Sequence, residues 1–230
     1  ALPVEYKNNK QDYLKLIEEE MLPKIAKEGL ADYIDVFCEK GYFSIEDMEQ
    51  IIYAGKQYGL IPKVHVNQFN ILGGIASAVK LGALSVDHLE VINQDDIEAL
   101  KNTKTISTLL PSCSFFLNIP YAPARKMIDY GLPVCLASDY NPGSTPSGNM
   151  NFVISLACIQ MKMSPEEAIN AATINGAYAM GISQTEGSIA KGKKGNIFIT
   201  KQIPSYAFLP YNFGHNIINK VFINGCEFKQ

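Results

Sequence analysis

Short apolar segments alternate with segments of helical spacing along the first 140 residues, and this rhythm limits the fold more than any other feature. Strands are expected at residues 33–39, 62–67, 83–88, 105–110 and 131–137. Between them, apolar positions with helical spacing predict helices at residues 44–59, 73–81, 95–100 and 122–130. Such an alternation is typical of repeated βαβ units, whose strands pair into one parallel sheet. The sequence therefore predicts an α/β protein.

Both flanks of this region differ from it. Residues 10–28 predict an amphipathic helix that is interrupted at Pro23, and residues 150–161 and 164–181 predict two further helices. From Gly187 onward, segments 187–189, 195–200 and 219–225 indicate antiparallel strands of a separate small sheet. We therefore expect one body at residues 1–186 and a β-rich tail at residues 187–230.

Composition and charge exclude several classes of protein. The 230 residues are 47% hydrophobic and carry a formal net charge of -3, which gives no electrostatic reason to expect nucleic acid or an anionic membrane as a partner. No apolar run approaches the roughly 20 residues of a membrane span, and no signal-peptide pattern is present. We expect a cytoplasmic protein. The five cysteines form no CxxC pair and are expected to be reduced and structural.

Asp139 directly follows the last of the five predicted strands and precedes a run of turn-forming residues at 140–144. In α/β proteins, catalytic side chains collect at the C-terminal ends of the strands. Asp139 is therefore a candidate metal ligand or general base. The alternative is that Asp139 caps the next helix or closes an Asx-turn with Asn141.

His65 lies on the second predicted strand and His88 ends the third, so both share the strand-end position of Asp139. Neutral imidazole and carboxylate suit Zn or Fe, and a bound divalent ion lowers the pKa of water to about 7. The remaining histidine or acid is then available to transfer the proton. Each histidine has a simpler alternative, which is a hydrogen bond to a neighbouring backbone group.

Several motifs occur in an order that is more specific than any one of them. They lie at residues 35–39, 63–65 with Gln68, 85–90, 109–111 with 115–117, 123–125, 139–144 and 164–168. With this ordered set the chain resembles the imidazolonepropionases of the amidohydrolase superfamily. These enzymes open the cyclic amide of 4-imidazolone-5-propionate by hydrolysis, which gives N-formimidoyl-L-glutamate in histidine degradation.

The resemblance implies a (β/α)8 barrel that carries one Zn or Fe ion. His65 and Asp139 would be metal ligands, and His88 would lie beside the metal-bound water. Because position 68 is an amide here, proton transfer would fall on His88 and Asp139. The resemblance also implies contacts with substrate or product from Gln68, Asn141, Gly143 and Ser144.

The superfamily's paired metal histidines, in a His-x-His arrangement, do not occur in this sequence. Only five strands precede the β tail, whereas a complete barrel has eight and needs roughly 250 residues. We therefore expect a C-terminal portion of the enzyme, with two further histidine ligands supplied by an N-terminal region. We expect the isolated chain to bind metal weakly and to lack useful activity, and the full-length enzyme to be a homodimer.

Two other interpretations stay open. One is a different amidohydrolase, such as a cytosine or guanine deaminase or another cyclic amidase. The second is a non-catalytic interaction module that descends from such an enzyme. The segment 141–144 after Asp139 favours imidazolonepropionase, and metal content distinguishes an enzyme from a module.

Overall fold

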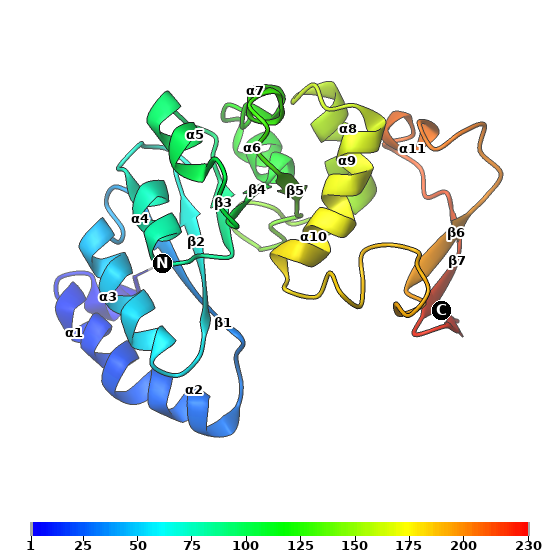
Figure 1. The fold of residues 1–230 in the computed structure, drawn as a ribbon. Coiled ribbons are helices and arrows are strands. Elements are labelled where there is room, and N and C mark those ends of the chain that lie inside the picture. The colour runs from blue at the N-terminus through cyan, green and yellow to red at the C-terminus, as the bar shows by residue number, and fades with distance from the viewer. Residues whose placement is uncertain (1, 230) are drawn as a thin grey trace. The chain divides into compact units, whose positions relative to one another are not determined.

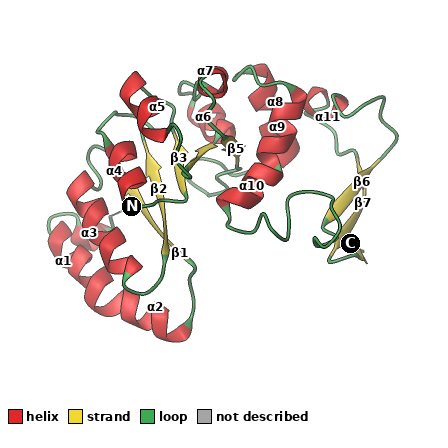
Figure 2. Cartoon of the chain, in the orientation of Figure 1, coloured by secondary structure: helices red, strands yellow, loops and turns green. Residues whose placement is uncertain are grey.

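A computed structural model describes residues 2–229, and the chain divides into two compact units at Ser107/Thr108. Figure 1 follows the chain by residue number, and Figure 2 separates helices from strands. The hydrogen-bonded strand order of the larger sheet is β1-β2-β3-β4-β5, and the division between the units falls within β4. Each unit is described by itself below.

The first unit contains the parallel strands that begin this sheet. They are β1 (Tyr33–Cys38), β2 (Ile61–Val66), β3 (Ser85–His88) and the start of β4 (Ile106–Leu109). The helices are α1 (Lys10–Leu16), α2 (Leu22–Glu28), α3 (Ile45–Lys56), α4 (Gly74–Lys80) and α5 (Gln94–Leu100), with a short 3-10 turn at Val4–Tyr6. Val36 pairs with Val64, and Val64 pairs with Val86, so the three parallel strands run in register.

The predicted interruption at Pro23 is absorbed without a break in the helical path. A π-helical turn, η2 (Ile17–Met21), joins α1 to α2, and Pro23 lies in the first turn of α2. Proline removes one hydrogen bond there, and the wider π-helical turn before it, in which the N–H of Leu22 donates to the carbonyl of Ile17, accommodates the ring. The helix that follows β1 begins as its sequence indicates, with a capping box between Ser44 and Asp47.

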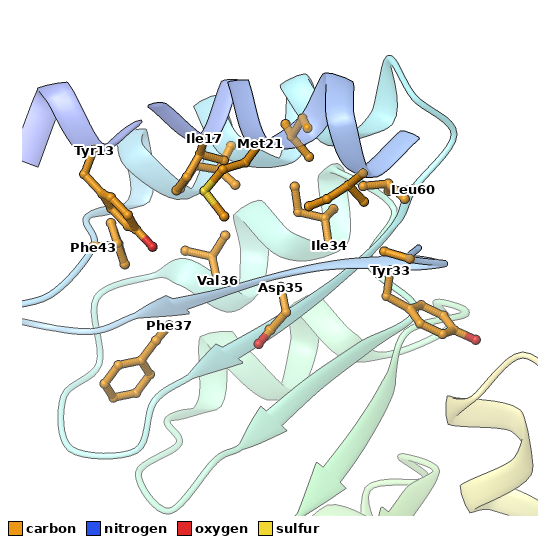
Figure 3. Close-up of a pocket in the computed structure, with 14 residues that line it drawn as sticks. Tyr13, Ile17, Met21, Tyr33, Ile34, Asp35, Val36, Phe37, Phe43 and Leu60 are labelled. Carbon is orange, nitrogen blue, oxygen red and sulfur yellow. The ribbon is translucent and has the colours of Figure 1, made fainter. Parts of the chain in front are cut away.

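Side chains of β1 alternate between two environments, as the pleat of a strand requires. Ile34, Val36 and Cys38 are buried. Figure 3 shows Ile34 and Val36 directed toward the helices, while Tyr33, Asp35 and Phe37 point away from them. An open pocket of about 320 Å³ lies where Ile17 and Met21 face Ile34 and Val36. The apolar face of β1 thus packs on α3, and α1, η2 and α2 line the pocket above it. The other face of β1 carries Tyr33, Asp35 and Phe37 (Figure 3).

The second unit combines one short strand, several helices and a small antiparallel sheet. Its strands are β5 (Val134–Leu136), β6 (Ile197–Thr200), β7 (Ile218–Ile223) and β8 (Cys226–Phe228), the last three forming the antiparallel sheet β6-β7-β8. Its helices are α6 (Pro111–Leu117), α7 (Ala124–Asp129), α8 (Met150–Ile159), α9 (Pro165–Ala172), α10 (Ile174–Ala179) and α11 (Phe208–Tyr211).

Two expectations for this unit are wrong, and two of its helices are not predicted by the sequence. Residues 187–189 are not a strand, because Gly187 has φ +83° and its Cα packs against α10. The single helix expected at residues 164–181 is broken at Thr173, whose φ of -118° and ψ of -88° are not helical. The helices that the sequence pattern does not predict are α6 and α11. The division of the chain at residues 186 and 187 stays a prediction.

The structure contains no disulfide among its described residues, which include all five cysteines. Burial raises the pKa of the Cys38 thiol to about 11, with a smaller contribution from neighbouring acids such as Glu39. A thiol with so high a pKa is a poor nucleophile at neutral pH, which agrees with the structural role expected for it. Over the described residues, none of the helices combines the length and the apolar character that crossing a bilayer requires.

Gly187 and Gly192 provide a matched test of the packing on α10. Both have positive φ, so alanine at either position adds a backbone cost of roughly 1–2 kcal/mol. At Gly187 a Cβ would also lie 2.5 Å from the Cβ of Ala177, whereas at Gly192 it would meet open space. We expect Gly187→Ala to lower the free energy of unfolding by roughly 1–3 kcal/mol more than Gly192→Ala does. Urea unfolding of both variants measures this difference, and equal values would contradict the packing described here.

Candidate functional site

His65 and His88 come together on the first unit, as their strand-end positions predict. Their ring centroids are 5.4 Å apart. His65 lies on β2, where the register places it opposite Phe37 of β1 and Asp87 of β3. Its Nδ1 lies 2.8 Å from Asp35 Oδ2 and 2.9 Å from Asp35 Oδ1. A carboxylate of the neighbouring strand therefore holds the first of the two histidines.

His88 ends β3 on a backbone that few residues adopt. Its φ is +90°, and Leu89 follows with φ +66°. These left-handed conformations are unfavourable for residues other than glycine, so the surrounding structure must stabilise them. The turn brings the Glu90 carboxylate back to His88, with 3.3 Å between Nδ1 and Oε1. Both side chains are buried, 5% and 1% exposed respectively, and pairing offsets the cost of burying them.

Gln68 is buried in the loop after β2, and both of its chain neighbours are fixed to other elements. On one side, Asn67 adopts φ +58° and donates from Nδ2 to Asp96 Oδ2 at 3.0 Å. On the other side, the N–H groups of Phe69 and Asn70 donate to Glu39 Oε2.

Glu39 fixes this loop to the end of β1. Its carboxylate is 1% exposed and also accepts from the N–H of Lys40 and from Nδ2 of Asn70, each at 2.9 Å. Four donors thus satisfy one buried carboxylate, which is the condition for burying a charge without a cation beside it. The position of Gln68 therefore depends on the C-terminal ends of both β1 and β2.

In the second unit, Asp139, Asn141, Gly143 and Ser144 lie in one tight turn after β5. Asn141 Oδ1 accepts from the N–H groups of Gly143 and Ser144, each at 2.8 Å, and Asn141 Nδ2 donates to the carbonyl of Asp139 at 2.7 Å. The Ser144 hydroxyl donates to Asp139 Oδ2 at 3.2 Å. Asp139 itself has φ +52°. The four residues expected to act together are thus joined by their own hydrogen bonds.

The alternatives for Asp139 do not fit this geometry. The side chain that closes the turn belongs to Asn141 and not to Asp139. The next helix, α8, is capped by Asn149, whose Oδ1 accepts from the N–H groups of Asn151 and Phe152. A carboxylate that neither caps a helix nor closes the turn is consistent with a role in binding or chemistry.

Three acids support the site residues without being identifiable as such by the strand-end rule: Asp35, Glu39 and Glu90. The sequence does contain a signal for Asp35. An acid inside the apolar strand 33–38 has to lie on the face opposite the one that is buried. Glu39 ends the first predicted strand, and Glu90 lies two residues after the third. At such positions the sequence alone does not separate a buried carboxylate from an exposed one. Their burial becomes visible only with the structure.

The chain as a whole is similar to several known proteins. A profile of the amidohydrolase family matches residues 26–227. Curated relatives named imidazolonepropionase include one from Christiangramia forsetii, 65% identical over 98% of this chain and 55% of its own length. Another, from Flavobacterium psychrophilum, is 67% identical over the same shares, and one from Clostridium tetani is 47% identical over 98% of this chain and 54% of its own. The chain thus spans about half the length of the curated relatives it matches.

Solved structures share the fold at low sequence identity. A zinc-bound adenosine deaminase from Xanthomonas campestris superposes with a TM-score of 0.74 at 16% identity, over 91% of this chain and 55% of that one. An atrazine chlorohydrolase from Arthrobacter aurescens, complexed with zinc and atraton, gives 0.74 at 17% identity, over 93% and 55%. The expected fold class, a partial α/β barrel followed by a small antiparallel sheet, is confirmed. The expected resemblance is confirmed as well, and the chain belongs to the amidohydrolase family.

Proposed function

We propose that the protein carrying this chain hydrolyses the cyclic amide of 4-imidazolone-5-propionate to N-formimidoyl-L-glutamate, a step of histidine degradation. The observation that carries the proposal is the identity of 65–67% to relatives named imidazolonepropionase, maintained over 98% of the chain. The polar side chains at the C-terminal ends of β1, β2 and β3 are held by hydrogen bonds and contacts to acids, which supports a catalytic use of that region. The proposed setting is the cytoplasm, with the full-length enzyme a homodimer.

Amidohydrolases are generally metal-dependent, and the donors in this chain fit Zn or Fe. We assign His65 and Asp139 as two of the ligands, because imidazole nitrogen and carboxylate oxygen suit either ion. The carboxylate that holds His65 Nδ1 leaves Nε2 as the basic nitrogen of the neutral ring. When bound, the ion supplies Lewis acidity and lowers the pKa of a water to about 7. Two further histidine ligands would come from another part of the protein.

His88 is assigned to proton transfer. Because its Nδ1 faces the Glu90 carboxylate, the proton of the neutral ring belongs on Nδ1, and Nε2 is left as the base. In the proposed reaction, Nε2 of His88 takes the proton of the attacking water and returns it to the ring nitrogen that leaves. Asp139 shares this proton chemistry, since Gln68 has no carboxyl group with which to do so.

Substrate contacts are assigned to Gln68 and to the turn after β5. Gln68 offers one amide donor and acceptor pair from a loop that Glu39 and Asp96 hold in place. The Asn141 side chain already bonds the backbone of Gly143 and Ser144, which supports a role for it in shaping the turn that receives the substrate.

A fusion protein tests the proposal. The portion of the C. forsetii relative that precedes the match is joined to this chain, which restores the length of the relatives. We expect the fusion to bind one metal ion and to consume 4-imidazolone-5-propionate, and we expect the isolated chain to do neither usefully. A metal-loaded fusion that leaves this substrate unchanged would contradict the assignment, and trials with nucleobases and other cyclic amides would then follow.

Separate alanine variants in the fusion distinguish a metal ligand from a proton-transfer residue. We expect His65→Ala and Asp139→Ala to lose bound metal together with activity. His88→Ala should keep its metal while kcat falls by roughly 10²–10⁴, the usual contribution of a general base. Metal analysis and steady-state kinetics check both, with His215→Ala, an exposed residue of the tail, as the control. Loss of metal from the His88 variant would refute its assignment.

Asn141→Ala tests the turn after β5. Removing the amide leaves the N–H groups of Gly143 and Ser144 without their acceptor, so the turn should lose its shape. We expect kcat/KM to fall by about tenfold or more, mostly through KM, since a loss of about 1.4 kcal/mol is tenfold. The control is Asn149→Ala, which removes the cap of α8 and should cost about 1 kcal/mol of stability with KM unchanged. Equal KM values for the two variants would be evidence against the turn as a substrate contact.

A further inference from the structure

We propose that Asp35 is a positioning residue that orients His65 for metal binding. The inference rests on the proposed function, because it takes His65 to be a ligand. It goes beyond that function in assigning a role to an acid of β1 that neither the strand-end rule nor the family resemblance identifies.

The contact between the two side chains follows from the register of β1 and β2. Asp35 pairs with Lys63 and Phe37 pairs with His65, so Asp35 and His65 are diagonal neighbours on one face of the sheet. Figure 3 shows Asp35 on the side of β1 that points away from the helices, opposite in direction to Ile34 and Val36. Both carboxylate oxygens lie within 2.9 Å of His65 Nδ1.

This contact decides which nitrogen of His65 can bind a metal. A neutral imidazole has one N–H, and a carboxylate facing Nδ1 favours the tautomer that carries the proton there. The lone pair then belongs to Nε2, and the direction of the hydrogen bond also fixes the rotation of the ring. A second carboxylate on this face, Asp87, accepts from the Ser85 hydroxyl at 2.6 Å, so the two acids serve different partners. Supporting carboxylates of this kind are general in proteins that bind metal through histidine.

A purely structural role does not account for the pair. The side chains of His65 and Asp35 are 31% and 42% exposed, and exposed ion pairs contribute little to stability. Removing the carboxylate should therefore leave the fold intact, and its effect should appear in metal binding.

The experiment compares Asp35→Ala, Asp35→Asn and the control Asp32→Ala in the fusion protein. Asp32 is an exposed acid three residues earlier that precedes β1. Zinc affinity is measured by competition with a chelator, the visible spectrum is recorded with Co²⁺ in place of zinc, and thermal unfolding is followed on the metal-free proteins. We expect Asp35→Ala to weaken zinc binding by about 10–100-fold and to change the Co²⁺ spectrum, with metal-free unfolding unchanged. Asp35→Asn keeps an oxygen that accepts from Nδ1–H, so it should recover part of the affinity.

Zinc affinity of Asp35→Ala within twofold of the parent fusion would overturn the inference while the proposed function stands. A fall in affinity that is matched by a fall in metal-free stability, with no recovery in Asp35→Asn, would also overturn it, because the role would then be structural. A parent fusion that binds neither zinc nor iron would remove the proposed function and this inference with it.

Discussion

The pleat of β1 and β2 is the constraint on which the site depends. Successive side chains of a strand point to opposite faces, so the residues that pack on the helices and those that do chemistry are interleaved. In β2, Val64 and Val66 are fully buried, and His65 lies between them on the other face. Burying the two valines contributes roughly 1.5–3 kcal/mol each. A register shift of one residue would expose both valines and turn the imidazole toward the helices, so the apolar packing keeps His65 on its face of the sheet.

A second constraint is the unusual backbone conformation of residues at the strand ends. Asn67, His88 and Asp139 follow or end β2, β3 and β5, and all three have positive φ. Such conformations cost of the order of 1–3 kcal/mol at residues other than glycine and persist only where surrounding contacts fix them. Here the contacts are visible, since Asn67 is bonded to Asp96, His88 is paired with Glu90, and the Asp139 carboxylate accepts from Ser144. Asn67 and His88 belong to the first unit and Asp139 to the second, so each unit contains at least one strand end of this kind.

The sequence predicted what depends on local pattern. The strands of the larger sheet follow from apolar runs, and α3 follows from the capping pair Ser44 and Asp47. What it did not predict depends on contacts between separate elements: Gly187 packs against α10, and the Asp35 to His65 contact requires the register between two strands. Spacing along the chain identified His65, His88 and Asp139 as candidates, but it contains no information about which carboxylate faces which nitrogen.

The number of available donors explains why metal binding is the sensitive observable for this chain. A structural or catalytic zinc ion takes three or four protein ligands, and the proposed ligands here are two, His65 and Asp139. The two further histidine ligands of the proposal would come from another part of the protein, because the other histidines of this sequence are His88, assigned to proton transfer, and His215, in the tail. In this proposal, affinity for the ion depends on two quantities: the orientation of His65, which the Asp35 carboxylate contacts, and the supply of the remaining donors. Variants of Asp35 in a protein whose other metal ligands are unchanged alter only the orientation of His65, so they separate its effect from that of the remaining ligands.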